Sequence, residues 1–506
     1  MANHLFDALF APLAGRGGDL LILPDGRRLN GAAFLDLVAG MARAMQALGV
    51  VKGDRVAVQV SKSPEALACY GAAVALGAVF LPLNTAYTPA EVAYFLGDAR
   101  PRLFLCDGAK AVAMAPVAAQ AGARLVVLNA DGTGELADLA TAATGDIRAE
   151  PCAPGDLAAI LYTSGTTGRS KGAMLTHANL LSNAEVLVRE WRFTPDDVLL
   201  HALPIFHTHG LFVASNVALL SGGAMIWLPG FDAGAVLRML PAATVMMGVP
   251  TFYTRLLEEP GLTRDLVGHM RLFVSGSAPL LAETHEAWAA RTGHRILERY
   301  GMTETNMNTS NPYEGERRAG TVGFPLPGVE LRILAEGRDV PVGEVGMIEV
   351  RGPNVFAGYW QMPEKTAEEL RADGWFITGD LGMRDGDGYV HIVGRAKDLV
   401  ITGGYNVYPK EVELVLDEVP GVAESAVIGV PHPDFGEAVF AVLVARKGAG
   451  LEAEAVLAAI ADRLARFKQP KAAVVVDSLP RNTMGKVQKN LLRDSYRGWF
   501  RQGGEI

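Results

Sequence analysis

Short apolar runs alternate with segments of helical spacing over most of the chain. Near-continuous apolar runs occupy residues 56–60, 78–81, 103–106 and 157–161, and further runs follow at 245–248 and 272–275. Strands that are apolar along their whole length, rather than at every second position, are typical of a parallel sheet covered on both faces. The pattern therefore predicts an α/β fold made of repeated strand–helix units.

One uncharged segment, residues 66–83, is as long as a minimal membrane span. It is dominated by alanine and contains Gly71, Gly77 and Pro82. These residues divide it into a helix that begins near Ser63 and ends near Gly77, followed by a buried strand at 78–81. We therefore expect a core element and no membrane span.

The pattern changes in the last third of the chain. From about residue 329 it predicts mainly strands, with a turn at 385–388, and after residue 398 a new α/β pattern begins. That pattern predicts helices at 409–416 and 451–466 and strands at 422–430, 438–444 and 473–476. We expect a large N-terminal domain of parallel α/β subdomains plus a β-rich subdomain, residues 1–396, and a small α+β domain, residues 397–506.

A loop rich in glycine and hydroxyl side chains, residues 162–172 (YTSGTTGRSKG), follows the strand predicted at 157–161. Its backbone N–H groups, its hydroxyls and Lys171 suit a bound anion. We expect a helix to begin at 175–180, which gives a strand–phosphate loop–helix order. Ser170 and Gly172 flank Lys171, so the loop does not match the Walker A pattern.

The amino-acid composition limits the classes of molecule that this protein is expected to bind. The net charge is -9 and no basic run is present, which argues against nucleic acid, and we expect small-molecule substrates. The chain has three cysteines without metal-site spacing. The first residues also lack the charged start of a signal peptide. We expect a cytoplasmic protein, either a monomer or a weak dimer.

Two further segments carry candidate ligand groups. Residues 199–211 (LLHALPIFHTHGL) place His207 and His209 at a strand end, where a pocket wall is favoured over a metal site because no cysteine or carboxylate accompanies them. Residues 272–280 form a strand followed by a loop of small residues. Ligands bind at the carboxyl ends of parallel strands, so Gly276 and Ser277 are candidates for an adenine pocket, although a plain strand-to-helix turn has the same pattern.

The loop at 162–172 resembles the T-S-G-T-T-G-x-[ST]-K-G signature of the adenylate-forming superfamily, which includes acyl-CoA synthetases, firefly luciferase and peptide-synthetase adenylation domains. Four later motifs match the same superfamily in order, at 298–304 (ERYGMTE), 378–380 (TGD), 394–398 (GRAKD) and 480–489 (PRNTMGKVQK). The resemblance covers essentially the whole chain. It implies the superfamily fold, with a mobile C-terminal domain that turns about a hinge at Lys397.

The resemblance also implies roles for individual residues. Tyr300 would stack on adenine, Thr303 would bind phosphate, Asp380 would hold the ribose hydroxyls, Glu304 would coordinate Mg²⁺ and Lys486 would catalyse adenylation together with Thr303 and Glu304. The implied ATP-binding set is Thr163, Ser164, Gly165, Thr166, Thr167, Gly168, Lys171, Gly276, Ser277, Glu298, Tyr300, Gly301, Met302, Thr303, Asp380, Arg395 and Lys486. Coenzyme A is expected at Gly403, Gly404 and Tyr405.

The implied reaction joins an acid to coenzyme A at the expense of ATP, releasing AMP and pyrophosphate. Arg299 departs from the commonest superfamily pattern, which has a small residue before Tyr-Gly. A guanidinium there would be costly against an alkyl chain but would suit a second carboxylate. Together with residues 204–211, this segment resembles the acyl-CoA synthetases that activate malonate, so we expect malonate, with methylmalonate as a secondary substrate.

Other readings remain open. Arg299 could instead pair with Glu298 as part of the scaffold. The malonate-pocket candidates are Arg299, His207, Ser277 and Arg255, and for Arg255 a solvated helix face is equally compatible. An acetate or other short-chain acyl-CoA ligase, an enzyme that loads a separate carrier, and a non-catalytic nucleotide-binding scaffold are the alternatives. The presence of both Glu304 and Lys486 argues against the scaffold.

Overall fold

The computed structural model describes residues 2–143, 147–163, 170–402, 405–433, 435–464, 466–482 and 485–501. The chain divides into two compact units. The first is Met1–Leu331 with Val350–Phe376, and the second is Arg332–Glu349 with Ile377–Ile506. No helix among the described residues is long and apolar enough to cross a membrane.

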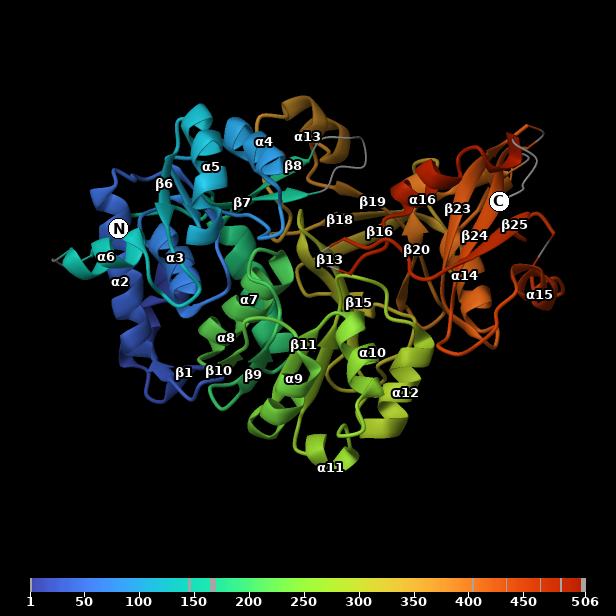
Figure 1. Cartoon of the computed structure of the whole chain (residues 1–506), viewed down its shortest axis with the longest axis horizontal. Coiled ribbons are helices and arrows are strands. Elements are labelled where there is room, and N and C mark those ends of the chain that lie inside the picture. Colours follow the sequence, from blue (N-terminus) through green and yellow to red (C-terminus); the bar gives the residue numbers. More distant parts are fainter. Residues whose placement is uncertain are drawn as a thin grey trace. The chain divides into compact units, whose positions relative to one another are not determined.

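A six-stranded sheet forms one part of the first unit. Its order is β6 (Arg124–Val127), β5 (Leu103–Cys106), β3 (Arg55–Gln59), β4 (Val79–Pro82), β7 (Leu157–Thr163) and β8 (Lys171–Thr176). All neighbours pair in parallel except β8, which runs antiparallel to β7 at the edge. Helices α4 (Pro89–Ala99) and α5 (Gly108–Ala121) pack their apolar residues on one face (Figure 1). The predicted parallel sheet is confirmed here.

Local signals set the helices around this sheet. In α3 (Pro64–Ala75) the Ser63 hydroxyl accepts from the Ala66 N–H, and Pro64 occupies the first turn. In α4, Thr88 and Glu91 form a capping box. Almost every residue of α3 is buried, so the uncharged segment is a core helix followed by β4, as its composition predicts.

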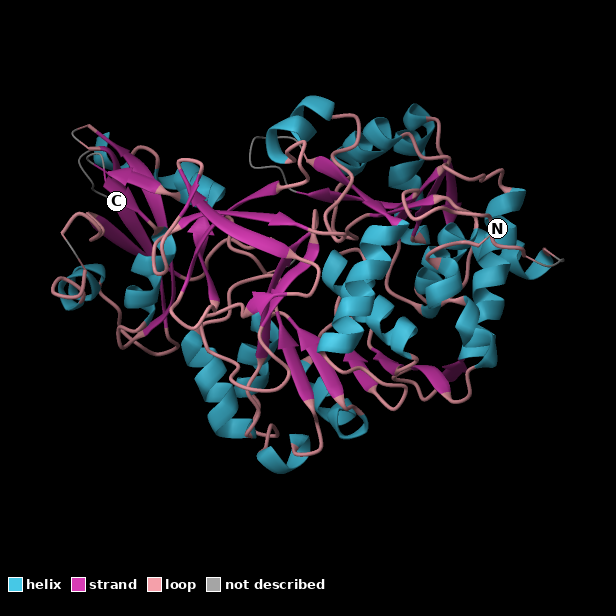
Figure 2. Ribbon diagram, turned by 180° about the vertical axis from the view of Figure 1, so that it is seen from behind, coloured by secondary structure: helices cyan, strands magenta, loops and turns pink. Residues whose placement is uncertain are grey.

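A nine-stranded sheet forms the other large part of the first unit (Figure 2). Its order is β15 (Phe324–Pro325), β14 (Asn306–Ser310), β13 (Leu297–Met302), β12 (Leu272–Ser275), β11 (Val245–Gly248), β9 (Val198–His201), β10 (Ala224–Trp227), β1 (Asp19–Ile22) and β2 (Arg28–Asn30). The strands from β13 to β1 are parallel, whereas β14, β15 and β2 run antiparallel to their neighbours. Apolar residues of α9 (Ala233–Met239), α10 (Pro250–Glu258) and α12 (Ala282–Thr292) pack against β9–β12.

The first unit contains seven further α-helices among the described residues. They are α1 (Phe6–Leu9), α2 (Gly31–Ala47), α6 (Glu135–Ala142), α7 (His177–Glu190), α8 (Asn216–Ser221), α11 (Arg264–Val267) and α13 (Pro363–Glu369).

The order predicted around the phosphate loop is wrong in one respect. Residues 171–176 form strand β8, which pairs with β7 from Thr163↔Lys171 to Leu157↔Thr176. Helix α7 begins only at His177, capped by Thr176. The loop therefore joins two antiparallel strands, so no helix N-terminus directly follows it.

The second unit is built on two five-stranded sheets. One has the order β17 (Arg338–Asp339), β16 (Glu330–Ala335), β18 (Gly346–Arg351), β19 (Phe376–Arg384) and β20 (Val390–Arg395), in which the first residues of β16 and β19 and the last of β18 belong to the first unit. The other contains β22 (Tyr405–Val407), β21 (Val400–Thr402), β24 (Gly436–Ala445) and β23 (Val422–His432), with β25 (Ala472–Val476) beside β24.

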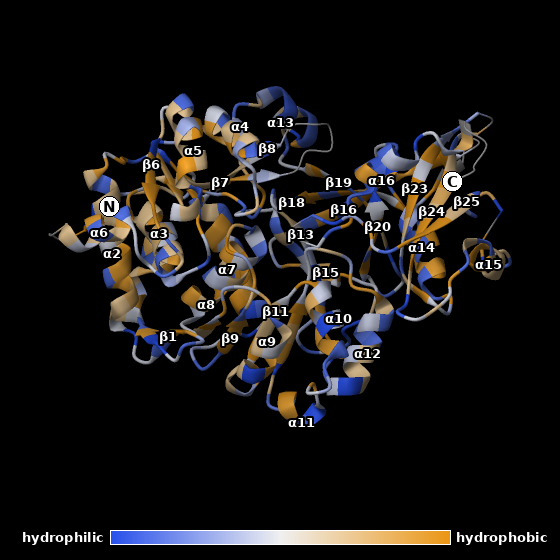
Figure 3. Ribbon diagram, viewed as in Figure 1, coloured by the Kyte–Doolittle hydropathy of each residue, from blue (hydrophilic) through white to orange (hydrophobic). Residues whose placement is uncertain are grey.

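Helices of the second unit match the sequence pattern unevenly. Helix α14 (Pro409–Asp417) and the strands β23, β24 and β25 lie where they are predicted, and apolar residues dominate β23 and β24 (Figure 3). Helix α15 (Ala453–Ala459) is much shorter than the predicted helix at 451–466. The last helix is α16 (Lys489–Tyr496).

Candidate active site

A strained turn follows strand β12. Ser277 has a φ of 71°, which lies in the left-handed region that non-glycine residues seldom adopt. Its hydroxyl lies 3.2 Å from Nδ1 of His209. The turn lies at the carboxyl end of β12, which pairs with β13, the strand that carries Arg299.

The Arg299 side chain occupies space that only a glycine at 276 leaves open. A Cβ added at Gly276 would lie 2.4 Å from Cζ of Arg299 and 2.6 Å from its Nε. Such contacts are well inside van der Waals separation. Gly276 and Arg299 are therefore a matched pair, since one makes room for the other.

Arg299 is a deeply buried cation. It is 3% exposed, and its Nε and Nη2 atoms have no hydrogen-bond partner among the described residues. Burial lowers the pKa of Arg299 to about 9, against the opposing effects of Tyr253 and Glu298, which still leaves it charged at neutral pH. A buried charge with unused donors is unfavourable unless an anion pairs with it.

His209 lies beside this cation and is the residue that the sequence reasoning undervalued. It begins the π-helix η2 (His209–Ser215) and is 1% exposed, and its Nε2 atom has no partner in the described part of the chain. Burial and then the Arg299 guanidinium lower the pKa of His209 well below its ordinary value, so the ring is neutral. Helices of the π type often occur at functional sites, but no sequence pattern marked this one.

The other two malonate candidates lie differently. His207 is half-buried, and its Nδ1 accepts a hydrogen bond from the His209 N–H. Arg255 is an exposed residue on α10. The roles of His207 and Arg255 stay predictions.

The segment 298–304 folds around a bulge between β13 and β14. The register shifts between Tyr300 and Gly301, and a Cβ at Gly301 would lie 1.8 Å from the Asn306 carbonyl oxygen. Tyr300, Gly301, Met302 and Thr303 are all partly exposed here. Glu298 instead accepts a hydrogen bond from the Leu280 N–H, which indicates a scaffold role for its carboxylate.

A network of ionic and polar side chains joins Lys171 to Glu304. The Lys171 ammonium lies 3.0 Å from both carboxylate oxygens of Glu369 and 4.1 Å from the ring centre of Tyr359. The Tyr359 hydroxyl lies 2.5 Å from Glu369 Oε2 and 3.0 Å from Glu304 Oε1. Neither Tyr359 nor Glu369 was singled out from the sequence.

Several predicted ligands fall outside the described residues. Thr163 is described, and its hydroxyl lies 3.5 Å from the Lys171 carbonyl oxygen. The loop residues Ser164, Gly165, Thr166, Thr167 and Gly168 are not described, nor are the coenzyme A candidates Gly403 and Gly404. Tyr405 is described only as part of β22.

The second unit carries the remaining predicted groups. Asp380 is 4% exposed and forms an ion pair with Arg395, whose Nε lies 2.7 Å from Asp380 Oδ1. Burial and then the Arg395 guanidinium lower the pKa of Lys486, although the residue as a whole is exposed. Lys397 lies in the single turn Ala396–Asp398 that follows β20.

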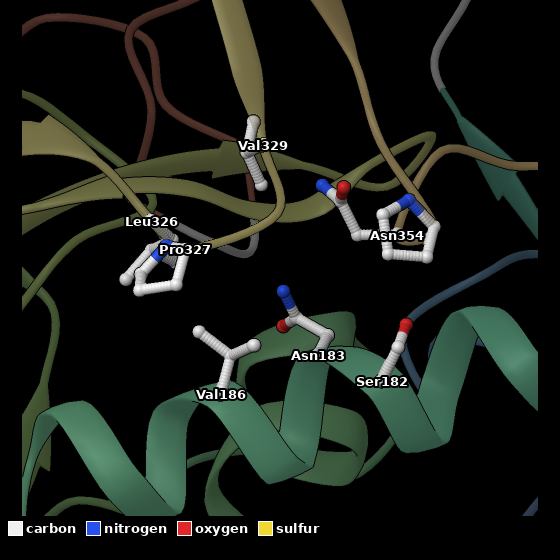
Figure 4. A pocket seen from close by; sticks show the side chains of 8 residues that line it. Ser182, Asn183, Val186, Leu326, Pro327, Val329 and Asn354 are labelled. Atoms are coloured by element: carbon white, nitrogen blue, oxygen red, sulfur yellow. The ribbon is translucent and has the colours of Figure 1, made fainter.

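A small cavity elsewhere in the first unit carries no such chemistry. Helix α7 contributes Asn183 and Val186 to its wall, and Leu326 and Asn354 face them (Figure 4). The amide of Asn183 is already bonded to the Met307 backbone. The residues around Arg299 and Glu304 therefore remain the candidate site.

Comparison with known proteins gives the class of the chain. Residues 13–360 match the model of the AMP-binding enzyme family, and residues 411–486 match the model of the AMP-binding enzyme C-terminal domain. The chain therefore belongs to the AMP-binding enzyme family, and the predicted adenylate-forming fold is confirmed.

Individual relatives are more specific. ATP-bound MatB from Rhodopseudomonas palustris is 57% identical, with a TM-score of 0.97 over 99% of this chain and 100% of that one. Malonate–CoA ligase of Arabidopsis thaliana is 36% identical over 89% of this chain and 79% of the plant protein. Sulfoacetate–CoA ligase of Cupriavidus necator is also 36% identical, over 96% and 97% of the two chains.

Proposed function

We propose that this protein is an AMP-forming ligase that joins malonate to coenzyme A, with methylmalonate as a secondary substrate. The observation that carries the choice of acid is Arg299, a buried cation whose Nε and Nη2 donors meet no acceptor in the described residues. A dicarboxylate offers one carboxylate for activation and a second for this guanidinium. The relative named a malonate–CoA ligase supports the same acid.

The pocket chemistry favours a short second anion. His209 is neutral and lies next to the cation, and its Nε2 meets no partner among the described residues, so it can hydrogen-bond a carboxylate without adding charge. The Ser277 hydroxyl lies within hydrogen-bond distance of the other ring nitrogen of His209, Nδ1. Acetate would leave the guanidinium unpaired, and a long alkyl acid would place methylenes against it.

The first half-reaction forms an acyl-adenylate. A malonate oxygen attacks the α-phosphorus of ATP, an O–P bond forms, and the bond to the bridging oxygen breaks so that pyrophosphate leaves. Both reactants are anions, so the residues needed are cations and hydrogen-bond donors. Lys171 would hold the departing phosphates, Thr303 would donate to them, and Lys486 would meet the carboxylate and α-phosphate oxygens.

The second half-reaction forms the thioester. The sulfur of coenzyme A attacks the acyl carbon, and the C–O bond to AMP breaks. We place a hinge at Lys397, between residues 1–396 and 397–506, so that Lys486 leaves and the coenzyme A residues take its place. Gly403 and Gly404 would allow the backbone to approach pantetheine closely.

Glu304 fits a magnesium ion that is shared with substrate. No group of three or more metal-ligating side chains is found in the ranges that the structure covers. Mg²⁺ in nucleotide enzymes is held by one or two carboxylates with phosphate oxygens and water completing its shell. The buried Glu304 carboxylate supplies one such ligand, and the ion would neutralise charge on the phosphates.

Measuring AMP release with several acids tests the proposal. With ATP, Mg²⁺ and coenzyme A present, malonate should give the highest kcat/KM and methylmalonate a lower one, ahead of acetate, succinate, octanoate and sulfoacetate. Preference for acetate or octanoate would refute the dicarboxylate pocket. ATP binding without malonate-dependent exchange of pyrophosphate would indicate a nucleotide-binding scaffold instead.

A further inference from the structure

Glu369 forms an ion pair with Lys171, the lysine proposed to bind the phosphates of ATP. Both of its carboxylate oxygens lie 3.0 Å from the Lys171 ammonium, and the two side chains are only 24% and 13% exposed. Phosphate oxygens would compete with this carboxylate for the same cation. Lys171 lies at the start of β8 and Glu369 ends α13, so the contact joins segments far apart in sequence.

The carboxylate of Glu369 is held firmly in its charged form. It also accepts from the Tyr359 hydroxyl at 2.5 Å and pairs with Lys365 at 3.0 Å. Burial acts to raise the pKa of Glu369, but the hydrogen bonds from Tyr359, Lys365 and Lys171 outweigh it and the pKa is lowered. At neutral pH a polyphosphate therefore meets an anion already bound to Lys171.

We propose that Glu369 is a positioning residue that acts as an internal counter-anion for Lys171, and that the phosphates of ATP or pyrophosphate must displace it to bind. This inference rests on the proposed function, because it assigns Lys171 to the phosphates. In the nucleotide-free protein Glu369 holds the lysine in place over the Tyr359 ring. It lowers the affinity for pyrophosphate and so aids release of that product.

Tyr359 extends the effect to Glu304. A phenol has one proton, so Tyr359 can donate to Glu369 or to Glu304 but not fully to both. Once Lys171 leaves Glu369, that carboxylate becomes the stronger acceptor for the Tyr359 hydroxyl. The hydrogen bond from Tyr359 to Glu304 Oε1 then weakens.

Binding of pyrophosphate, measured by calorimetry with Mg²⁺ present, tests this. Glu369→Gln should bind pyrophosphate about 5- to 30-fold more tightly than wild type, the size of effect expected for coupled neighbouring charges. Glu368→Gln is the matched control, because Glu368 lies one residue away on α13, pairs with Lys365 and is not bonded to Lys171 in any contact that the structure gives. In turnover, Glu369→Gln should lower the KM for ATP without raising kcat.

A double-mutant cycle separates this role from a structural one. In a Lys171→Met background, Glu369→Gln should no longer tighten binding. Equal or weaker binding by Glu369→Gln, or tightening that persists without Lys171, would overturn the inference while the proposed function stands. Wild type that binds neither ATP nor pyrophosphate would overturn both.

Hydrogen exchange of the wild-type protein gives a measurement that needs no stable variant. Pyrophosphate should increase exchange in residues 363–369, because α13 loses the contact between Glu369 and Lys171. The same peptide should be insensitive to pyrophosphate in Lys171→Met. Unchanged or decreased exchange in wild type would contradict the displacement.

Discussion

At the residue scale, the proposed choice of substrate depends on Arg299. Replacing it with alanine removes the charge that a second carboxylate would meet, and leaves that carboxylate buried without a partner. We expect kcat/KM for malonate to fall by about 200- to 5,000-fold, from the ~3–5 kcal/mol typical of a broken buried charge pair. Acetate turnover should change far less.

Arg255→Ala provides the comparison for Arg299→Ala. Arg255 is exposed on α10, so its removal should leave kcat/KM for malonate within a few-fold of wild type. Steady-state rates of AMP release with both acids give the two ratios. Full malonate activity in Arg299→Ala would mean that the guanidinium is scaffold.

Gly276→Ala should reproduce much of the loss of malonate activity expected for Arg299→Ala, although it leaves the Arg299 guanidinium in the protein. The new Cβ would lie 2.4 Å from Arg299 Cζ, so the guanidinium must move out of its place. We expect malonate to lose at least about tenfold in kcat/KM, equivalent to about 1.4 kcal/mol, with acetate less affected. A crystal structure of the variant would show whether Arg299 has shifted, and unchanged malonate kinetics would contradict the pairing.

At the element scale, helix α14 of the second unit ends at Asp417, a carboxylic acid whose burial is expected to lower the stability of the protein. Burial raises the pKa of Asp417 to about 6 from 3.8. A raised carboxyl pKa lowers stability as pH rises: the penalty is absent below 3.8, grows between 3.8 and about 6, and is complete above that. Asp417 accepts from the Ser425 hydroxyl at 2.7 Å, a bond that asparagine can keep.

Asp417→Asn should therefore stabilise the protein at neutral pH. We expect its free energy of unfolding to exceed that of wild type by about 1–3 kcal/mol near pH 7.5, and by nothing below about pH 4. Urea unfolding at several pH values measures the difference. Asp494→Asn, at an exposed position of α16, should show no such pH-dependent gain.

Elements were predictable where local chemistry and burial agreed. The start of α3 at Ser63 and the buried strands β3, β4 and β5 lie where the sequence places them. Strand β8 was missed because residues 171–176 carry few local strand signals and owe their conformation to pairing with β7. Helix α15 was overestimated because apolar spacing alone does not say where a helix stops.

At the scale of the whole molecule, replacing Lys486 should impair adenylate formation but not thioester formation. Lys486→Ala should reduce malonate-dependent exchange of pyrophosphate into ATP by at least about 100-fold, equivalent to about 2.7 kcal/mol of lost transition-state stabilisation. Conversion of supplied malonyl-adenylate and coenzyme A to the thioester should continue at near the wild-type rate. Loss of both half-reactions to the same extent would contradict the division of labour.

The sequence by itself determined the class of protein and predicted the groups that handle ATP. Five segments, residues 162–172, 298–304, 378–380, 394–398 and 480–489, could be identified without coordinates, because they match motifs of the adenylate-forming superfamily in residue type, spacing and order. Arg299 was also visible, since a cation stands where the superfamily commonly has a small residue.

Only the tertiary structure decided how these groups meet. His209 lies far along the chain from Arg299, and Tyr359 and Glu369 lie far from Glu304 and Lys171, so spacing does not mark these residues as partners. The room that Gly276 leaves for Arg299 depends likewise on the parallel pairing of β12 with β13. Such contacts follow from packing across the sheets, which brings together residues whose separation along the chain carries no signal.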